Sequence, residues 1–107
     1  MTRMSQVIRI KIPASLTIWK SRQNFIAVAK DKATIDVLTP YVGKIVEVEI
    51  SSITVQTRLV KLKQKETYYI GVFLPKRLAP TWEKLRQKSN EYNAVIVITE
   101  RNDGEQT

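Results

Sequence analysis

The strict alternation of apolar and polar side chains in several short segments is the feature that most constrains this fold. In residues 6–12, three isoleucines alternate with Arg9 and Lys11. Because successive side chains of a strand point to opposite faces, a period of two predicts a strand with one buried and one basic face. Four further segments are expected to be strands, namely Lys44–Ile50, Ile53–Lys63, Thr67–Leu74 and Ala94–Glu100.

Two segments have helical spacing instead. Apolar residues of Asn24–Leu38 recur at three- and four-residue steps, Asn24 is an acceptable N-cap, and Pro40 ends the predicted helix. Leu78, Trp82 and Leu85 predict a second, short helix. The expected fold is therefore α+β, mostly β, with the order β-α-β-β-β-α-β.

Two irregularities interrupt the predicted strands. Pro13 either ends the first strand or places it on a sheet edge, because proline cannot donate a ladder hydrogen bond. The parity of Ile53–Lys63 slips near Leu59, which predicts a bulge or a strong coil. The segment 64–66 is expected to be the loop of a hairpin.

The length of 107 residues favours one domain, since two separate cores would each be too small to fold easily. We expect residues 1–100 to form that single domain and residues 101–107 to be a flexible polar tail. No apolar run reaches the roughly 18 residues that a membrane span needs, and no signal peptide is recognisable. A cytoplasmic protein that does not bind membranes is expected.

The chain contains no cysteine and no histidine. Disulfides and thiolate chemistry are thereby excluded, and both the usual general base near neutral pH and the commonest zinc ligand are missing. Glu47 and Glu49 lie on one strand face, but no third acid accompanies them, so salt bridges to a basic strand explain them better than a metal site. We expect no enzyme activity, no metal and no cofactor.

An excess of 18 Lys and Arg over 10 Asp and Glu gives a net charge of +8, which indicates a polyanionic partner, above all nucleic acid. Four cations stand within residues 58–65, and like charges so close repel each other unless an anion is present. A β-ribbon with such charge can enter a DNA groove. The candidate nucleic-acid contacts are Arg9, Lys11, Arg58, Lys61, Lys63, Lys65, Lys76 and Arg77.

The aromatic residues near this charge have two interpretations. Tyr68 and Tyr69 adjoin the basic hairpin, and packing is the first interpretation for both, with stacking on an unpaired base as the alternative. Trp19 is a candidate for the core, for an interface or for a stacking platform. Three cations of the second predicted helix are expected to be merely solvated, namely Lys84, Arg86 and Lys88.

The two halves of the chain resemble each other. Residues 9–16 (RIKIPASL) and 71–78 (GVFLPKRL) both read as a strand end, an apolar-Pro step and a leucine before a helix and a strand. The predicted repeats cover about residues 6–50 and 53–100. Such repeats are typical of two half-barrels that pack as one unit.

These motifs resemble the AbrB/SpoVT/antitoxin-type swapped-hairpin β-barrel family. That family has an R-x-x-I-P strand end and a G-D-x-V-x-V strand, matched in the first half by Arg9, Ile12, Pro13, Gly43, Val46 and Val48. The second half matches a basic strand at residues 58–62 and the apolar-Pro-Lys step at 74–76. Lys44 replaces the usual aspartate, and the long gap between Pro13 and Gly43 implies an inserted helix.

The resemblance implies a swapped-hairpin barrel built from two β-α-β repeats and a role as a transcriptional regulator or antitoxin that binds duplex DNA. By position it transfers a DNA contact to Arg9, Arg58, Lys61 and, more weakly, Lys76. It also implies a homodimer, and leaves open whether the repeats pair within one chain or between two.

Two alternatives remain open. The strand order also fits an elaborated ferredoxin-like β-α-β-β-α-β sheet, whose aromatic face at Tyr69 and Phe73 would stack bases of RNA or of another single strand. The other alternative is a protein-interaction or assembly module whose basic face docks an acidic partner.

Overall fold

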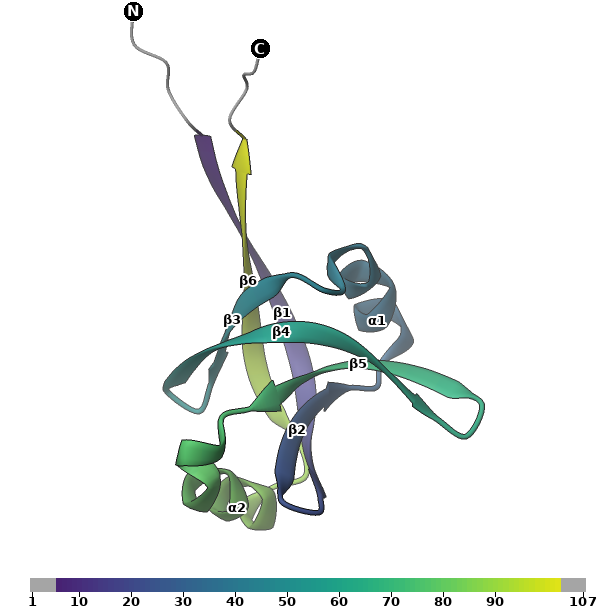
Figure 1. Cartoon of the computed structure of the whole chain (residues 1–107), viewed down its shortest axis with the longest axis vertical. Coiled ribbons are helices and arrows are strands. Elements are labelled where there is room, and N and C mark those ends of the chain that lie inside the picture. Colours follow the sequence, from purple (N-terminus) through teal and green to yellow (C-terminus); the bar gives the residue numbers. More distant parts are fainter. Residues whose placement is uncertain (1–5, 103–107) are drawn as a thin grey trace, which may run out of the picture.

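The computed structural model of the chain describes residues 6–102, which form a closed barrel of six antiparallel strands (Figure 1). The strands are β1 (Gln6–Ser21), β2 (Asn24–Ala29), β3 (Ile45–Ile50), β4 (Ile53–Gln64), β5 (Thr67–Leu74) and β6 (Tyr92–Asn102). The helices are α1 (Lys32–Leu38) and α2 (Ala79–Lys88), with 3₁₀ turns η1 (Thr39–Tyr41) and η2 (Lys76–Leu78) beside them. The predicted α+β, mostly β class is confirmed.

The strands follow the order β1-β2-β5-β4-β3-β6 around the barrel, and β6 pairs with β1 to close it. Each half of the chain contributes two strands, a helix and a third strand, and exchanging the halves leaves every strand pairing unchanged. The two hairpins share a register in which Ser21–Asn24 corresponds to Gln64–Thr67, 43 residues later. Val28 pairs with Gly71, its own counterpart, so this pair marks the axis of the internal symmetry.

The symmetry differs from the repeat motif that the sequence suggested. The predicted repeat matched Pro13 with Pro75, but Pro13 lies inside β1 whereas Pro75 follows β5. Nor does either half have the predicted β-α-β order, because a second strand precedes each helix. The open ferredoxin-like sheet is also wrong, since residues 6–16 of β1 pair with β6 and close the barrel.

The predicted helix over Asn24–Leu38 is wrong for its first half. Residues 24–29 form β2, and only Lys32–Leu38 is helical, with the Asp31 carboxylate as the cap that accepts from the Thr34 amide. Phe25 through Ala29 are all buried, because β2 has apolar neighbours on both faces. A strand buried on both faces shows no alternation, so its spacing imitated a helix.

Strand β1 is much longer than predicted and continues through Pro13 to Ser21. At Pro13 it pairs with β6 alone, because its pairing with β2 begins only at Leu16. Of the two predicted alternatives for Pro13, the edge position is therefore correct. A strand edge tolerates proline because the missing N–H need not donate to a second neighbouring strand.

The parity slip in β4 marks a change of partner. The strand pairs with β3 up to Arg58 and with β5 from Leu59 onward, in two continuous registers without a bulge. Up to Leu59 its inward residues are buried or half-buried in the barrel, whereas beyond it Lys61 and Lys63 on the same face are exposed. The slip thus indicates where the strand leaves the barrel.

The core fills the barrel and the space under both helices. Trp82 of α2 and Leu38 of α1 are fully buried against the strands, and the indole N–H of Trp82 donates to the Pro75 carbonyl at 2.8 Å. The predicted tail begins later than expected, because residues 101 and 102 belong to β6 and pair with β1. The rest of that predicted tail lies outside the described residues.

Candidate nucleic-acid interface

The hairpin of β4 and β5 extends beyond the barrel as a two-stranded ribbon, seen at the right of Figure 1. We call residues 60–71 the basic ribbon. Its turn has two residues, Lys65 and Glu66, and Lys65 adopts a positive φ of 57°. The structure therefore places the predicted residues Lys61, Lys63 and Lys65 along one arm and the tip of a single projecting element.

An exposed aromatic ring organises the charge on the basic ribbon. Tyr68 is opposite Lys63 and is 48% exposed. The ammonium of Lys61 lies 4.4 Å from the centre of the Tyr68 ring, and that of Lys63 lies 5.6 Å from it. Cation–π contact holds both ammonium groups over one face of the ribbon. Within residues 6–102, neither ammonium forms an ion pair with a carboxylate, so their charge is available to an external anion.

Arg58 is placed differently. It stands where β4 still belongs to the barrel, and its guanidinium donates to the Gly43 carbonyl in the turn before β3. This bond holds the loop between η1 and β3, so part of the Arg58 side chain has a structural role. It lies before the basic ribbon in the same strand.

Arg9 and Lys11 lie on the outer face of β1, away from the ribbon. The Arg9 guanidinium forms an ion pair with the Glu47 carboxylate of β3 at 3.2 Å. The expected salt bridge between Glu47 and a basic strand is thereby confirmed. It also neutralises part of the positive charge predicted for this face.

Lys76 and Arg77 are exposed in η2, at the end of β5 opposite to the ribbon tip (Figure 1). They therefore do not join Lys61, Lys63 and Lys65 in one patch. The eight predicted contacts thus form one basic ribbon and three separate places on the surface.

A groove that the sequence did not predict lies between the two hairpins. It has a volume of about 550 Å³ and is lined by Ile18, Trp19, Lys20, Ser21, Ile26, Leu62, Lys63, Gln64 and Arg86. Trp19 packs edge-to-face against Tyr69, with ring centres 5.6 Å apart. Lys20 is the counterpart of Lys63 in the internal symmetry, so an alignment shifted by 43 residues would have identified it.

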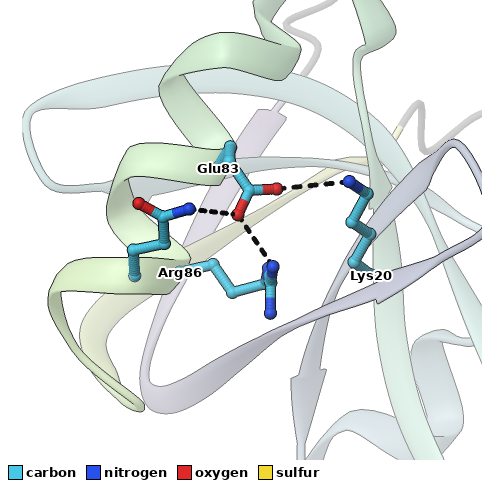
Figure 2. A network of polar contacts seen from close by, with 4 residues as sticks. Lys20, Glu83 and Arg86 are labelled. Atoms are coloured by element: carbon cyan, nitrogen blue, oxygen red, sulfur yellow. Dashed lines mark hydrogen bonds and ion pairs between the residues drawn. The ribbon is translucent and has the colours of Figure 1, made fainter.

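An ion network fixes the side of this groove next to α2 (Figure 2). One Glu83 oxygen accepts from Arg86 at 2.7 Å and from Gln87 at 3.0 Å, while the other, shielded from solvent, lies 3.4 Å from the Lys20 ammonium. Desolvation opposes the charge of Glu83, but the hydrogen bond and charge of Arg86, with Gln87 and Lys20, together hold its pKa below the ordinary value. The network ties α2 to β1.

Comparison of the sequence with protein families and with curated proteins, and of the fold with solved structures, finds no match. Among residues 6–102, no three acidic, His or Cys side chains gather as metal ligands would. In the same part of the chain, neither helix has the length and apolar character needed to cross a bilayer.

Proposed function

We propose that this protein binds nucleic acid through the basic ribbon, with duplex DNA as its main target. The observation that carries the proposal is the projecting ribbon itself, which presents Lys61, Lys63 and Lys65, none of them in an ion pair with a carboxylate of residues 6–102. Most DNA affinity comes from phosphate contacts that release counterions, and three lysines on one ribbon are suited to such contacts.

The shape of the ribbon favours duplex DNA. A B-DNA major groove is about 12 Å wide and accommodates a two-stranded β-ribbon. Entry of the ribbon would bring Tyr68 and its two lysines toward the groove wall, with Lys65 at the leading tip. Arg58, which precedes the ribbon in β4, would then be a secondary phosphate contact. Contacts of Arg9, Lys11, Lys76 and Arg77, which lie elsewhere on the surface, stay separate predictions.

The resemblance to swapped-hairpin barrels agrees with this proposal. The closed barrel, whose halves exchange without changing any strand pair, supports two fused repeats, each with the order β-β-α-β. We therefore extend the proposal to a DNA-binding regulator or antitoxin-like protein that acts without catalysis. The expected homodimer stays a prediction, which sedimentation of the full chain would test.

One observation favours a second candidate function, which is single-strand or RNA binding. Tyr68 is exposed between lysines, and an exposed aromatic ring beside cations can stack on an unpaired base. Duplex and single strand therefore have to be compared directly.

The test is fluorescence anisotropy of the full chain with duplex DNA, its single strands and the matching RNA, each at low and physiological salt. We expect duplex binding that survives physiological salt. A preference for single strands or RNA would replace duplex DNA by the second candidate. Loss of all binding at physiological salt would contradict both, and would leave the docking of an acidic protein partner as the role of the basic face.

A further inference from the structure

The groove between the hairpins is built from counterpart positions of the two halves. Lys20 corresponds to Lys63, Trp19 to Leu62, and Ser21 to Gln64 in the shared register. Such a groove exists only because the halves meet along β2 and β5. Arg86 of α2 adds a third cation on one side and makes the site asymmetric.

The lining combines an apolar floor with a cationic rim. Trp19, Ile26 and Leu62 supply the floor, and Lys20 and Arg86 supply the cationic rim. Lys63 also lines the groove, but its ammonium lies over the Tyr68 ring. No acidic residue belongs to the lining. A volume of about 550 Å³ lies within the roughly 300–1,000 Å³ typical of small-ligand sites. A ligand that fits this chemistry has a flat apolar part and an anionic part.

Two of the cations are held in place before any ligand arrives. Glu83 fixes Arg86 at 2.7 Å and Lys20 at 3.4 Å, so less side-chain entropy is lost when an anion binds beside them. The guanidinium has five N–H donors, and the bond to Glu83 leaves others for a phosphate. The edge-to-face contact with Tyr69 likewise fixes the plane of the Trp19 ring.

We propose that this groove binds a nucleoside phosphate, with its base on the Trp19 floor and its phosphate beside Lys20 and Arg86. A nucleoside phosphate supplies both the flat ring that stacks on an indole and the charge that the rim requires. It can come from a free nucleotide or from an unpaired nucleotide of a strand. This site is separate from the Tyr68 face of the ribbon and does not depend on duplex binding there.

Tryptophan fluorescence gives a direct test, because the chain has two tryptophans and only Trp19 lines the groove. Trp82 is fully buried and hydrogen-bonded to Pro75, so its emission serves as a constant background. We expect titration with AMP, or with a five-nucleotide oligodeoxyadenylate, to quench the emission. Quenching by AMP would identify a free-nucleotide site, and quenching by the oligonucleotide alone would identify a strand site.

A Trp19→Phe variant should lose the quenching. Quenching that persists in this variant, or an unchanged emission with both ligands at millimolar concentration, would overturn the proposal.

A matched pair of charge variants tests the rim. Arg86→Gln should weaken nucleotide binding about tenfold, since it removes one charge-assisted contact. Lys88→Gln removes the same charge from an exposed position of α2 outside the lining and should leave binding within about twofold. Equal losses of nucleotide affinity in both variants would show that only net charge matters. That result would contradict a specific binding site in the groove.

Both variants should bind duplex DNA as the unmodified chain does, because neither residue belongs to the basic ribbon. A failed nucleotide titration with intact duplex binding would therefore reject the groove without rejecting the proposed function. The converse result, nucleotide binding without duplex binding, would reject only the ribbon.

Discussion

The two hairpins of the barrel have the same backbone design and opposite environments. Each ends in a two-residue turn whose first residue has a positive φ, 59° at Arg22 and 57° at Lys65. Each also places a lysine ammonium 5.6 Å from the ring opposite it, Lys20 over Phe25 and Lys63 over Tyr68. Yet Phe25 is 5% exposed and Tyr68 is 48% exposed.

The helices account for the difference. The ten-residue helix α2 packs against β1, inserts Trp82 into the core and is tied to Lys20 through Glu83. The seven-residue helix α1 contributes only Leu38 as a buried residue and leaves the end of the second hairpin uncovered. The sequences of the two hairpins differ accordingly. Ile18 is buried in the first hairpin, whereas its counterpart in the second hairpin is the exposed Lys61.

One hairpin therefore stabilises the molecule, while its counterpart is free to contact a partner. Removing side chains from equivalent positions should consequently have different effects. Substitutions in the β1–β2 hairpin should lower the free energy of unfolding. Substitutions in the basic ribbon should lower the affinity for nucleic acid.

The largest effect is expected from Phe25→Ala. Deleting a buried aromatic ring costs about 3–5 kcal/mol, because it loses transfer free energy and leaves a cavity. Urea unfolding followed by circular dichroism would measure the loss in the free energy of unfolding.

The equivalent change in the other hairpin, Tyr68→Ala, is the matched control. It should change the free energy of unfolding by less than about 1 kcal/mol and weaken nucleic-acid binding instead, since base–aromatic contacts are worth about 1–3 kcal/mol. Similar destabilisation by both variants would show that the second ring is structural too.

The next effect concerns the axis between the hairpins, where Val28 faces Gly71. A Cβ at Gly71 would lie 2.7 Å from the Ala27 carbonyl oxygen and 3.1 Å from a methyl group of Leu62, so the backbone of β2 would have to shift. Gly71→Ala should therefore destabilise the chain by about 1–3 kcal/mol, measured by thermal unfolding. An unchanged melting temperature would mean that β2 and β5 can move apart enough to accommodate the added methyl group.

The smallest expected effect is a pH dependence of stability that arises where α2 is tied to the β1–β2 hairpin. Because the pKa of Glu83 is lowered in the folded state, its ionised form stabilises the fold above the ordinary value of 4.5. That contribution is lost as the pH falls through the lower folded-state pKa. Unfolding of the unmodified chain and of Glu83→Gln, compared from neutral to acidic pH, should show curves that converge at low pH.

Parallel pH curves for the two proteins would indicate that the network adds nothing to the attachment of α2. The basic ribbon has no such carboxylate network among the described residues. Substituting its lysines with glutamine should therefore not reproduce this pH dependence.

The sequence predicted the elements that have one buried face. Lys44–Ile50, Ile53–Lys63 and Thr67–Leu74 coincide with β3, β4 and β5 within one or two residues, because their alternation follows the barrel wall. It failed at β2, where burial on both faces removes the alternation. It also left open whether β1 ends at Pro13, although Ala14, Leu16 and Ile18 continue the inward period.

The candidate site was predictable in a similar way. Charge density alone indicated Lys61, Lys63 and Lys65, because these residues are close in sequence. The groove of Trp19, Lys20 and Arg86 was not predictable, since it needs two hairpins and a helix that meet only in the folded chain. A prediction that Arg86 is merely solvated misses its bond to Glu83.

The central claim, that the basic ribbon is the nucleic-acid contact, is tested most directly by the salt dependence of duplex affinity. The measurement compares the unmodified chain with a Lys61→Gln, Lys63→Gln and Lys65→Gln triple variant, with Lys84→Gln and Lys88→Gln as the charge control on α2. Three lost phosphate contacts should reduce the slope of log affinity against log salt by about 2.7, and the control should keep its slope. Equal slopes for the triple variant and the unmodified chain would contradict the account.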